Sequence, residues 1–112
     1  MTSGRDEYKE GLRAFKMGDY ARAYRMLKYF AAEGDQEAQV AVGSICQLGL
    51  GGLPIDEDEA VRWYTLASEQ GNGLASNNLG TIAISRNDRK AAMQWYSKAR
   101  QQGFRHSPRL LR

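Results

Sequence analysis

Apolar residues recur at every third or fourth position along most of this chain, the spacing that gathers them on one face of an α-helix. No stretch alternates apolar and polar residues as a half-buried strand would. The pattern predicts an all-α protein whose helices are separated by turns that contain glycine or aspartate. We expect six helices, at residues 3–16, 20–33, 36–48, 57–70, 73–85 and 89–102.

The predicted helices carry recognisable start and stop residues. Three of them follow an aspartate, whose carboxylate can accept a hydrogen bond from a backbone N–H of the first turn: Asp19, Asp56 and Asp88. Glu59 follows Asp56 by three residues, which is typical of a capping box. The same helices end before a glycine, the residue that adopts the left-handed helix end without a Cβ penalty: Gly34, Gly71 and Gly103.

One stretch of sequence occurs twice. Residues 60–71 and 92–103 both read Ala-x-x-Trp-Tyr-x-x-Ala-x-x-Gln-Gly, and a weaker copy occupies residues 23–34. Self-similarity of this length indicates a repeat architecture. Each copy pairs with the helix before it. We therefore predict one repeat domain over residues 1–112, with units at 3–34, 35–71 and 72–103 and a C-terminal cap or tail at 104–112.

A glycine stands inside the first helix of each predicted pair: Gly11, Gly43 and Gly80. Glycine in a helix interior costs about 1 kcal/mol relative to alanine. A cost that recurs in register suggests a use, and the missing Cβ would let a neighbouring helix approach closely.

The segment after the last repeat has its own signals. Ser107-Pro108 resembles an N-cap followed by proline at the first helical position. Leu110 and Leu111 would then begin another helix. We expect this tail to fold back as a cap over the last helix pair, or else to fray.

The repeat motifs resemble the Sel-one-like repeat, a relative of the tetratricopeptide repeat. The third unit carries the resemblance in Ala75-x-x-x-Leu79-Gly80, Asp88 and the Trp-Tyr and Gln-Gly of residues 92–103. The second unit carries it in Val42-Gly43, Gly51-Gly52-Leu53, Asp56 and Trp63-Tyr64. The first unit looks closer to a tetratricopeptide repeat, with Gly11, Gly18-Asp19-Tyr20 and Ala23. The third unit departs from the pattern because it lacks the glycine-rich loop between its helices.

The resemblance implies a right-handed α-solenoid of about three antiparallel helix pairs, plus a short C-terminal capping segment. The first helix of each pair would line a concave face and the second a convex face. Proteins of this kind, often bacterial, mostly act as non-catalytic adaptors or scaffolds that bind protein partners. Stacked helix pairs also leave an extended groove that suits a peptide or a helix.

The positions that share the phase of the concave face are mixed in character. Arg5, Glu37 and Leu74 belong to this phase. We predict that a partner protein or peptide binds at Tyr8, Leu12, Phe15, Val40, Ser44, Gln47, Asn77, Thr81 and Ile84. Two alternatives remain: a Sel-one-like protein that binds a small ligand or weakly hydrolyses β-lactams, and a homo-oligomer that associates through the ends of the array.

Composition adds few constraints. The 112 residues have an acidic middle at 35–71 and a basic end at 72–112. The net charge of +3 is too small to indicate nucleic acid, so we do not expect it as a partner. The single cysteine, Cys46, excludes an internal disulfide and a cysteine-based zinc site. The uncharged run at 38–55 is too polar and glycine-rich for a membrane span. The location would be cytoplasmic if the N-terminus is native, and periplasmic if a leader was removed.

No residue pattern predicts catalysis, a cofactor or a metal. The Trp-Tyr pairs at 63–64 and 95–96 fit core packing better than base stacking. The loop at 49–54 lacks the lysine of a phosphate-binding loop. The acidic run at 56–59 suits the positive end of a helix dipole. His106 has no second histidine or nearby cysteine.

Overall fold

The computed structural model describes residues 4–110, and in this range it is entirely helical. All six helices predicted between residues 3 and 102 are confirmed, with ends that agree to within one residue where they differ. They are α1 (Gly4–Lys16), α2 (Tyr20–Ala32), α3 (Gln36–Leu48), α4 (Glu57–Glu69), α5 (Gly73–Ser85) and α6 (Arg89–Gln101), with a short 3-10 helix, η1 (Leu50–Gly52), between α3 and α4.

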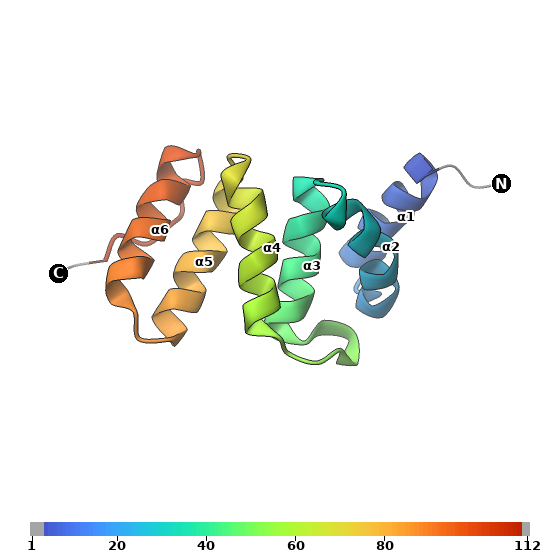
Figure 1. Ribbon diagram of the computed structural model, residues 1–112, viewed down its shortest axis with the longest axis horizontal. Helices are drawn as coiled ribbons and strands as arrows, with labels where there is room; N and C mark the ends of the chain where they lie inside the picture. Colours follow the sequence, from blue (N-terminus) through green and yellow to red (C-terminus); the bar gives the residue numbers. More distant parts are fainter. Residues whose placement is uncertain (1–3, 111–112) are drawn as a thin grey trace.

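The helices stack as three antiparallel pairs in chain order, α1 with α2, α3 with α4, and α5 with α6 (Figure 1). The second helix of each pair also packs on the first helix of the next. The main core runs from α1 to α5, and a smaller cluster of Ala83, Ala92 and Tyr96 lies between α5 and α6. The molecule is elongated, with extents of 55 × 27 × 21 Å. This is the predicted α-solenoid.

The glycines inside the first helices mark the closest approach within each pair. A Cβ built on Gly43 would lie 2.7 Å from Cε1 of Tyr64, and one on Gly80 would lie 2.5 Å from Cε1 of Tyr96. In the first pair, a Cβ on Gly11 would lie 2.7 Å from a methyl carbon of Leu27. The predicted use of these glycines is therefore confirmed, and the group that they admit is a side chain of the second helix.

The Trp-Tyr motif divides its two rings between core and margin. Tyr64 and Tyr96 are only 0% and 4% exposed, whereas Trp63 and Trp95 are half-buried and pack against the edge of the core. The predicted core packing is confirmed in full for the tyrosines and in part for the tryptophans. The tyrosine is the ring that faces the glycine, so it has no exposed edge.

The helix caps confirm two of the three predicted aspartates. Asp56 accepts from the N–H of Glu59, and Asp88 from the N–H of Ala91, both at 3.0 Å. The prediction for Asp19 is wrong, because its side chain caps no N–H of α2. The capping box is half formed: Glu59 does not bond the N–H of Asp56 but accepts from Nε1 of Trp63 at 3.3 Å.

The repeated Gln-Gly motif joins neighbouring repeats along the upper edge of the array in Figure 1. Nε2 of Gln70, at the end of α4, donates to the carbonyl oxygen of Gly34, at the end of α2, at 2.9 Å. Nε2 of Gln102, at the end of α6, donates to the carbonyl oxygen of Ser68 in α4 at 3.0 Å. Each glutamine thus links the end of its own second helix to the end of the preceding one.

The glycine-rich loop of the second repeat folds back on the array. Leu50 and Leu53 pack against the core. Gly51 has a positive φ of 68° and lies against α2, where an added Cβ would be 2.8 Å from the backbone nitrogen of Ala21. The loop therefore covers the junction between the first two repeats.

The C-terminal tail does not form the predicted helix at Ser107. The Ser107 hydroxyl donates to Oδ1 of Asn77 at 2.8 Å instead of capping a helix. Nη1 of Arg100 donates to the carbonyl oxygens of Ser107 and Pro108, so these oxygens are occupied by a side chain rather than by a following turn. Leu110 packs on the last helix pair, as a cap would, while Leu111 lies outside the described residues.

The glycine contact gives a first prediction. We expect Gly80→Ala to lower the free energy of unfolding by about 1–3 kcal/mol, because the new methyl group would overlap the Tyr96 ring. Gly4→Ala is the matched control, since a Cβ there meets nothing within 4 Å. Urea titration followed by circular dichroism measures both. Equal stability of Gly80→Ala and the wild type would contradict the close contact.

The caps give a second prediction with an internal control. Asp88→Ala should destabilise the fold by about 0.5–2 kcal/mol, because it leaves the N–H of Ala91 without its acceptor. Asp19→Ala should change stability much less, because its side chain caps no N–H. Melting temperatures compare the two variants directly, and an equal loss for both would refute the assignment of caps.

The two rings of the motif give a third prediction. Tyr96→Ala should cost about 3–5 kcal/mol, as for a large aromatic side chain removed from a core. Trp95→Ala should cost less, about 1–3 kcal/mol, because the half-buried ring loses less buried area. Chemical denaturation ranks the two, and a larger loss for Trp95→Ala would show that the rings have exchanged roles.

Candidate partner-binding face

The residues predicted to bind a partner come from the three first helices, which share one side of the array. They are distributed as Tyr8, Leu12 and Phe15 on α1, Val40, Ser44 and Gln47 on α3, and Asn77, Thr81 and Ile84 on α5. None of them is fully buried. The structure uses them in different ways, and only some line an open hollow.

An apolar hollow of about 280 Å³ lies where α1, α3 and the start of α5 meet. Four of the predicted residues line it: Leu12, Phe15, Val40 and Ser44. Leu74, which is 43% exposed, adds a further apolar wall. Lys16, Glu37 and Asn72 supply polar groups to the lining. An amphipathic segment could place apolar side chains in this hollow and keep its polar groups near these three residues.

Tyr8 is engaged by the fold at the edge of this face. Its hydroxyl donates to Oδ2 of Asp35 at 2.8 Å and lies 3.2 Å from Oε2 of Glu37. Burial, together with the hydrogen bond to Asp35, raises the pKa of the Tyr8 phenol well above its ordinary value. Since the same carboxylate oxygen of Asp35 accepts the N–H of Ala38 and caps α3, Tyr8 fixes α1 against the start of α3.

In the second repeat, a tyrosine of the second helix reaches through to the concave face. The Tyr64 ring passes the gap left by Gly43, and its hydroxyl donates to Oε1 of Gln47 at 2.7 Å and lies 3.1 Å from Oγ of Ser44. Burial raises the pKa of Tyr64 to about 12, although hydrogen bonds with Ser44 and Asn78 act against this. The hydroxyl is thus a neutral hydrogen-bonding group at all ordinary pH values.

The third repeat has a similar arrangement, except that the C-terminal tail bonds to one residue of the face. The Tyr96 hydroxyl lies 3.2 Å from Oγ1 of Thr81, next to Gly80. Asn77 is already occupied, because its Oδ1 accepts from Ser107 of the tail. Ile84 stands apart at the end of α5, 40% exposed. The tail therefore covers part of the face on α5 and leaves its far end open.

Sequence reasoning assigned the two tyrosines to the core and missed that their hydroxyls reach this face. The available signal was the order of residues, since Gly43-Ser44 and Gly80-Thr81 each place a hydroxyl directly after the glycine that admits the ring. The sequence also did not identify Lys16 and Asn72 as residues that line the hollow. They lie at helix ends, where the projection of a regular helix no longer gives the direction of the side chain.

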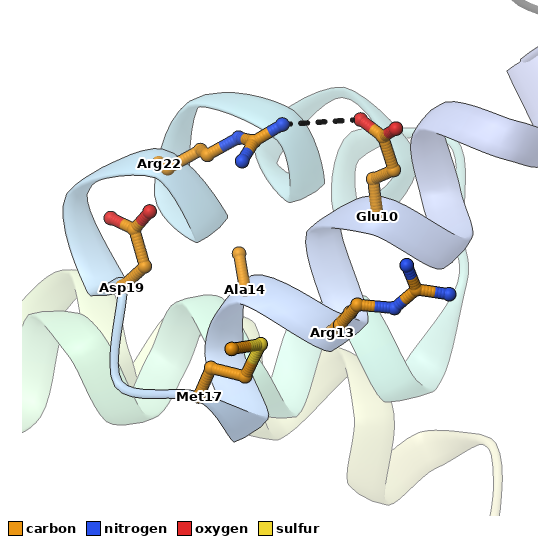
Figure 2. Close-up of a pocket in the computed structure, with 6 residues that line it drawn as sticks. All are labelled: Glu10, Arg13, Ala14, Met17, Asp19 and Arg22. Atoms are coloured by element: carbon orange, nitrogen blue, oxygen red, sulfur yellow. Dashed lines mark hydrogen bonds and ion pairs between the residues drawn. The ribbon is translucent and has the colours of Figure 1, made fainter.

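The N-terminal end of the array carries charged side chains. Figure 2 shows a hollow of about 290 Å³ on its outer side, lined by Glu10, Arg13 and the exposed Met17, with Arg22 and Glu10 in an ion pair at 3.3 Å. In register, α3 carries the buried Val42 and Ile45 where α1 has Glu10 and Arg13. This polar outer surface has the character of a terminal cap.

The remaining candidate groups for chemistry are used by the fold. Within residues 4–110, no group of three or more His, Cys, Asp and Glu side chains is placed to hold a metal ion. Burial, with the Glu59 carboxylate adding to it, raises the pKa of the Cys46 thiol to about 11, so the thiol stays protonated. None of the helices in the described range is long and apolar enough to cross a membrane.

Comparison with curated proteins places the chain among much longer relatives. It is 34% identical over 82 residues to chitin synthase regulatory factor 4 of Schizosaccharomyces pombe, and 31% identical over 80 residues to HRD3A of Arabidopsis thaliana, an ERAD-associated E3 ubiquitin-protein ligase component. Each match covers 71% of this chain but only 13% and 12% of those proteins. The chain thus spans a small part of these relatives.

Solved structures share the architecture. A protective antigen of uropathogenic Escherichia coli with an SLR fold superposes with a TM-score of 0.78 at 32% identity, over 89% of this chain and 23% of that one. A Sel1 repeat protein from Oxalobacter formigenes gives a TM-score of 0.69 at 29% identity, over 90% and 44%. The family model of the Sel1 repeat matches residues 4–35, 36–72 and 74–104, nearly the whole chain. The chain therefore belongs to the Sel1 repeat family.

Proposed function

We propose that this chain is a non-catalytic adaptor that binds a protein or peptide partner on its concave face. The observation that carries the proposal is the hollow between α1, α3 and α5, where Leu12, Val40 and Leu74 expose apolar surface beside polar groups. Partner segments commonly dock by placing apolar anchors in such a groove.

The face is apolar in one part and polar in another, which suggests how a bound segment would be oriented on it. Its α1 side offers the aliphatic and aromatic surface of Leu12 and Phe15. On α3 it offers the hydroxyl of Ser44 and the amide of Gln47, which contact the buried Tyr64 hydroxyl. We therefore expect a partner with large apolar side chains at one end and backbone or amide groups available for hydrogen bonds at the other.

The named relatives support an adaptor role. One is a regulatory factor of chitin synthase and another is a component of a ubiquitin ligase, and neither name describes a catalytic subunit. Because the chain spans only a small part of each, the resemblance supports binding through the repeats and does not identify the partner.

The residues that line the hollow give little support to a hydrolytic role. Ser44 is the hydroxyl that could act as a nucleophile there, and a tyrosine hydroxyl, that of Tyr64, lies 3.1 Å from it. A useful general base has a pKa near the working pH, whereas the pKa of Tyr64 is raised to about 12. This pair is therefore poorly suited to activate Ser44.

The test compares two leucines of equal exposure on different helices. Leu74 on α5, 43% exposed, lines the hollow, whereas Leu66 on α4, 44% exposed, does not. We expect Leu74→Arg to abolish capture of partners from native lysate by the immobilised chain, because it places a charge in the groove. Leu66→Arg should retain the same partners. Quantitative mass spectrometry measures the capture, and circular dichroism confirms that both variants fold.

Loss of the partners from both variants, or from neither, would contradict binding at the concave face. Light scattering of the purified chain distinguishes self-association from capture of another protein. A partner that proved to be a second copy would replace the adaptor proposal with a homo-oligomer.

A further inference from the structure

A second hollow, of about 270 Å³, lies on the side of α5 opposite to the concave face. Its floor consists of Leu79, Ile82 and Ala83. Successive helix residues are about 100° apart, so these side chains point away from Asn77 and Thr81. Val61 of α4 and Trp95 of α6 form the two walls. We call this the α4–α6 groove.

The second repeat has an equivalent groove between α2 and α4, built from the same register positions. Five positions line both grooves, and two of them are identical: Ile45 matches Ile82, and Asp56 matches Asp88. At the other three, Tyr24 in the second repeat's groove is replaced by Val61, Cys46 by Ala83, and Glu59 by Ala91. In each of these three pairs the α4–α6 groove has the smaller side chain. Its volume is correspondingly larger, about 270 Å³ against about 190 Å³.

The second repeat covers its groove with its own chain. Leu53 and Pro54, from the loop between α3 and α4, lie in the lining of that groove, and Leu53 packs against the core. The third repeat has no such loop, because only residues 86–88 separate α5 from α6. No loop residue of that repeat is available to line and narrow the α4–α6 groove as Leu53 does its equivalent. An aliphatic side chain is therefore the group that this geometry accepts.

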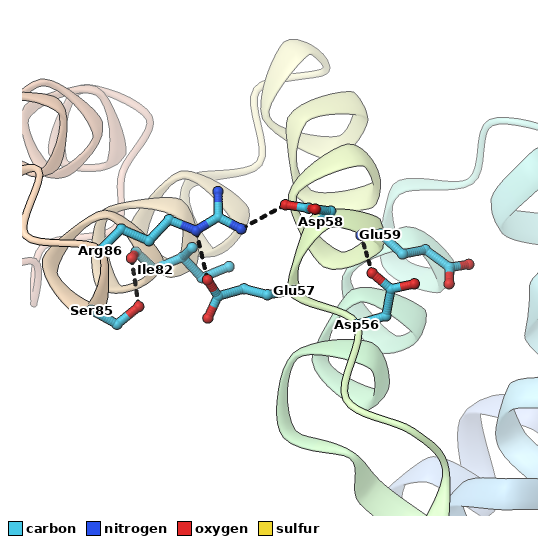
Figure 3. A network of polar contacts seen from close by, with 7 residues as sticks. All are labelled: Asp56, Glu57, Asp58, Glu59, Ile82, Ser85 and Arg86. Carbon is cyan, nitrogen blue, oxygen red and sulfur yellow. Dashed lines mark hydrogen bonds and ion pairs between the residues drawn. The ribbon is translucent and has the colours of Figure 1, made fainter.

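Charged residues around the opening of the α4–α6 groove add a second requirement for a group that binds there. Arg86 and Asp88 are the charged residues that line the hollow. Glu57 and Asp58 stand beside Arg86 (Figure 3), so these four residues together carry a net charge of −2. Arg86 pairs with Glu57 at 2.6 Å and with Asp58 at 2.7 Å. The basic residues that follow Asp88 on α6 project about 120° or more from the direction of the groove lining. The rim is therefore net acidic and favours a cation beside the inserted side chain.

We propose that the α4–α6 groove is a second docking site, which takes a partner segment that inserts a leucine flanked by a lysine or arginine. The leucine would occupy the place that Leu53 fills in the preceding repeat, and the basic residue would face the acidic rim. This site is independent of the concave face, because its lining residues point to the opposite side of α5.

A short synthetic peptide, acetyl-Lys-Gly-Leu-Pro-Lys-amide, is the probe. It copies the Gly-Leu-Pro of residues 52–54 and adds flanking cations. Titration into the ¹⁵N-labelled chain should give saturable amide shifts around Val61, Ile82 and Ala91. Replacing the leucine of the peptide with alanine should weaken binding about tenfold or more, because most of the buried aliphatic surface is lost. Replacing both lysines with glutamate should weaken it about threefold or more.

Two variants of the protein keep the test specific. Val61→Tyr introduces the residue that stands at the equivalent position of the second repeat and should remove binding by filling the groove. Ala91→Glu, matched to Glu59, is a second blocking variant in case the first fails to fold. Leu74→Arg, on the concave face, should bind the peptide like the wild type.

Several results would overturn the proposal. These are no saturable binding up to about 5 mM peptide, shifts centred on Ser44 and Val40, equal affinity for the leucine and alanine peptides, or unchanged binding by both blocking variants. A Trp63→Phe background leaves Trp95, in the groove wall, as the sole tryptophan. Its fluorescence then reports the same titration independently.

Discussion

The absence of a side chain at one position of each first helix governs the rest of this structure. Gly43 and Gly80 each leave a gap that a tyrosine ring fills at a distance no other residue would allow. The gap brings the two helices of a pair together and buries the ring completely. It also carries the ring's hydroxyl through to the other side of the first helix, where it meets Ser44 or Thr81. One contact thus sets both the spacing of the core and the chemistry of the concave face.

Differences between repeats arise where this shared contact is modified. The first repeat uses Leu27 in place of the tyrosine and has Leu12 after its glycine, so its part of the face is apolar. The later repeats present hydroxyls there. On the opposite side, the long loop of the second repeat narrows a groove that is wider in the third repeat. A uniform backbone therefore carries binding surfaces of different character.

The sequence predicted the helices, their pairing and the use of the helical glycines, because periodicity and internal repetition report local structure and register directly. It misplaced features that depend on contacts across the array. Asp19 has the position of a cap without the hydrogen bond, and Ser107 bonds to Asn77, a residue thirty positions away. Periodicity also placed the proposed binding face on the first helices. Which of its side chains are already engaged, as Tyr8 is by Asp35, depends on tertiary geometry.

The two long edges of the array differ in how firmly they join one repeat to the next. Along one edge, the side-chain amides of Gln70 and Gln102 donate hydrogen bonds to backbone carbonyls and so tie successive helix ends together. Between the second and third repeats, the other edge is joined by the exposed ion pairs of Arg86, which contribute little in water. The junction between these two repeats should therefore open more easily at the edge that the ion pairs join than at the edge that the glutamines join. We expect the curvature of the array to respond to ionic strength, while the packing order of the helices stays the same.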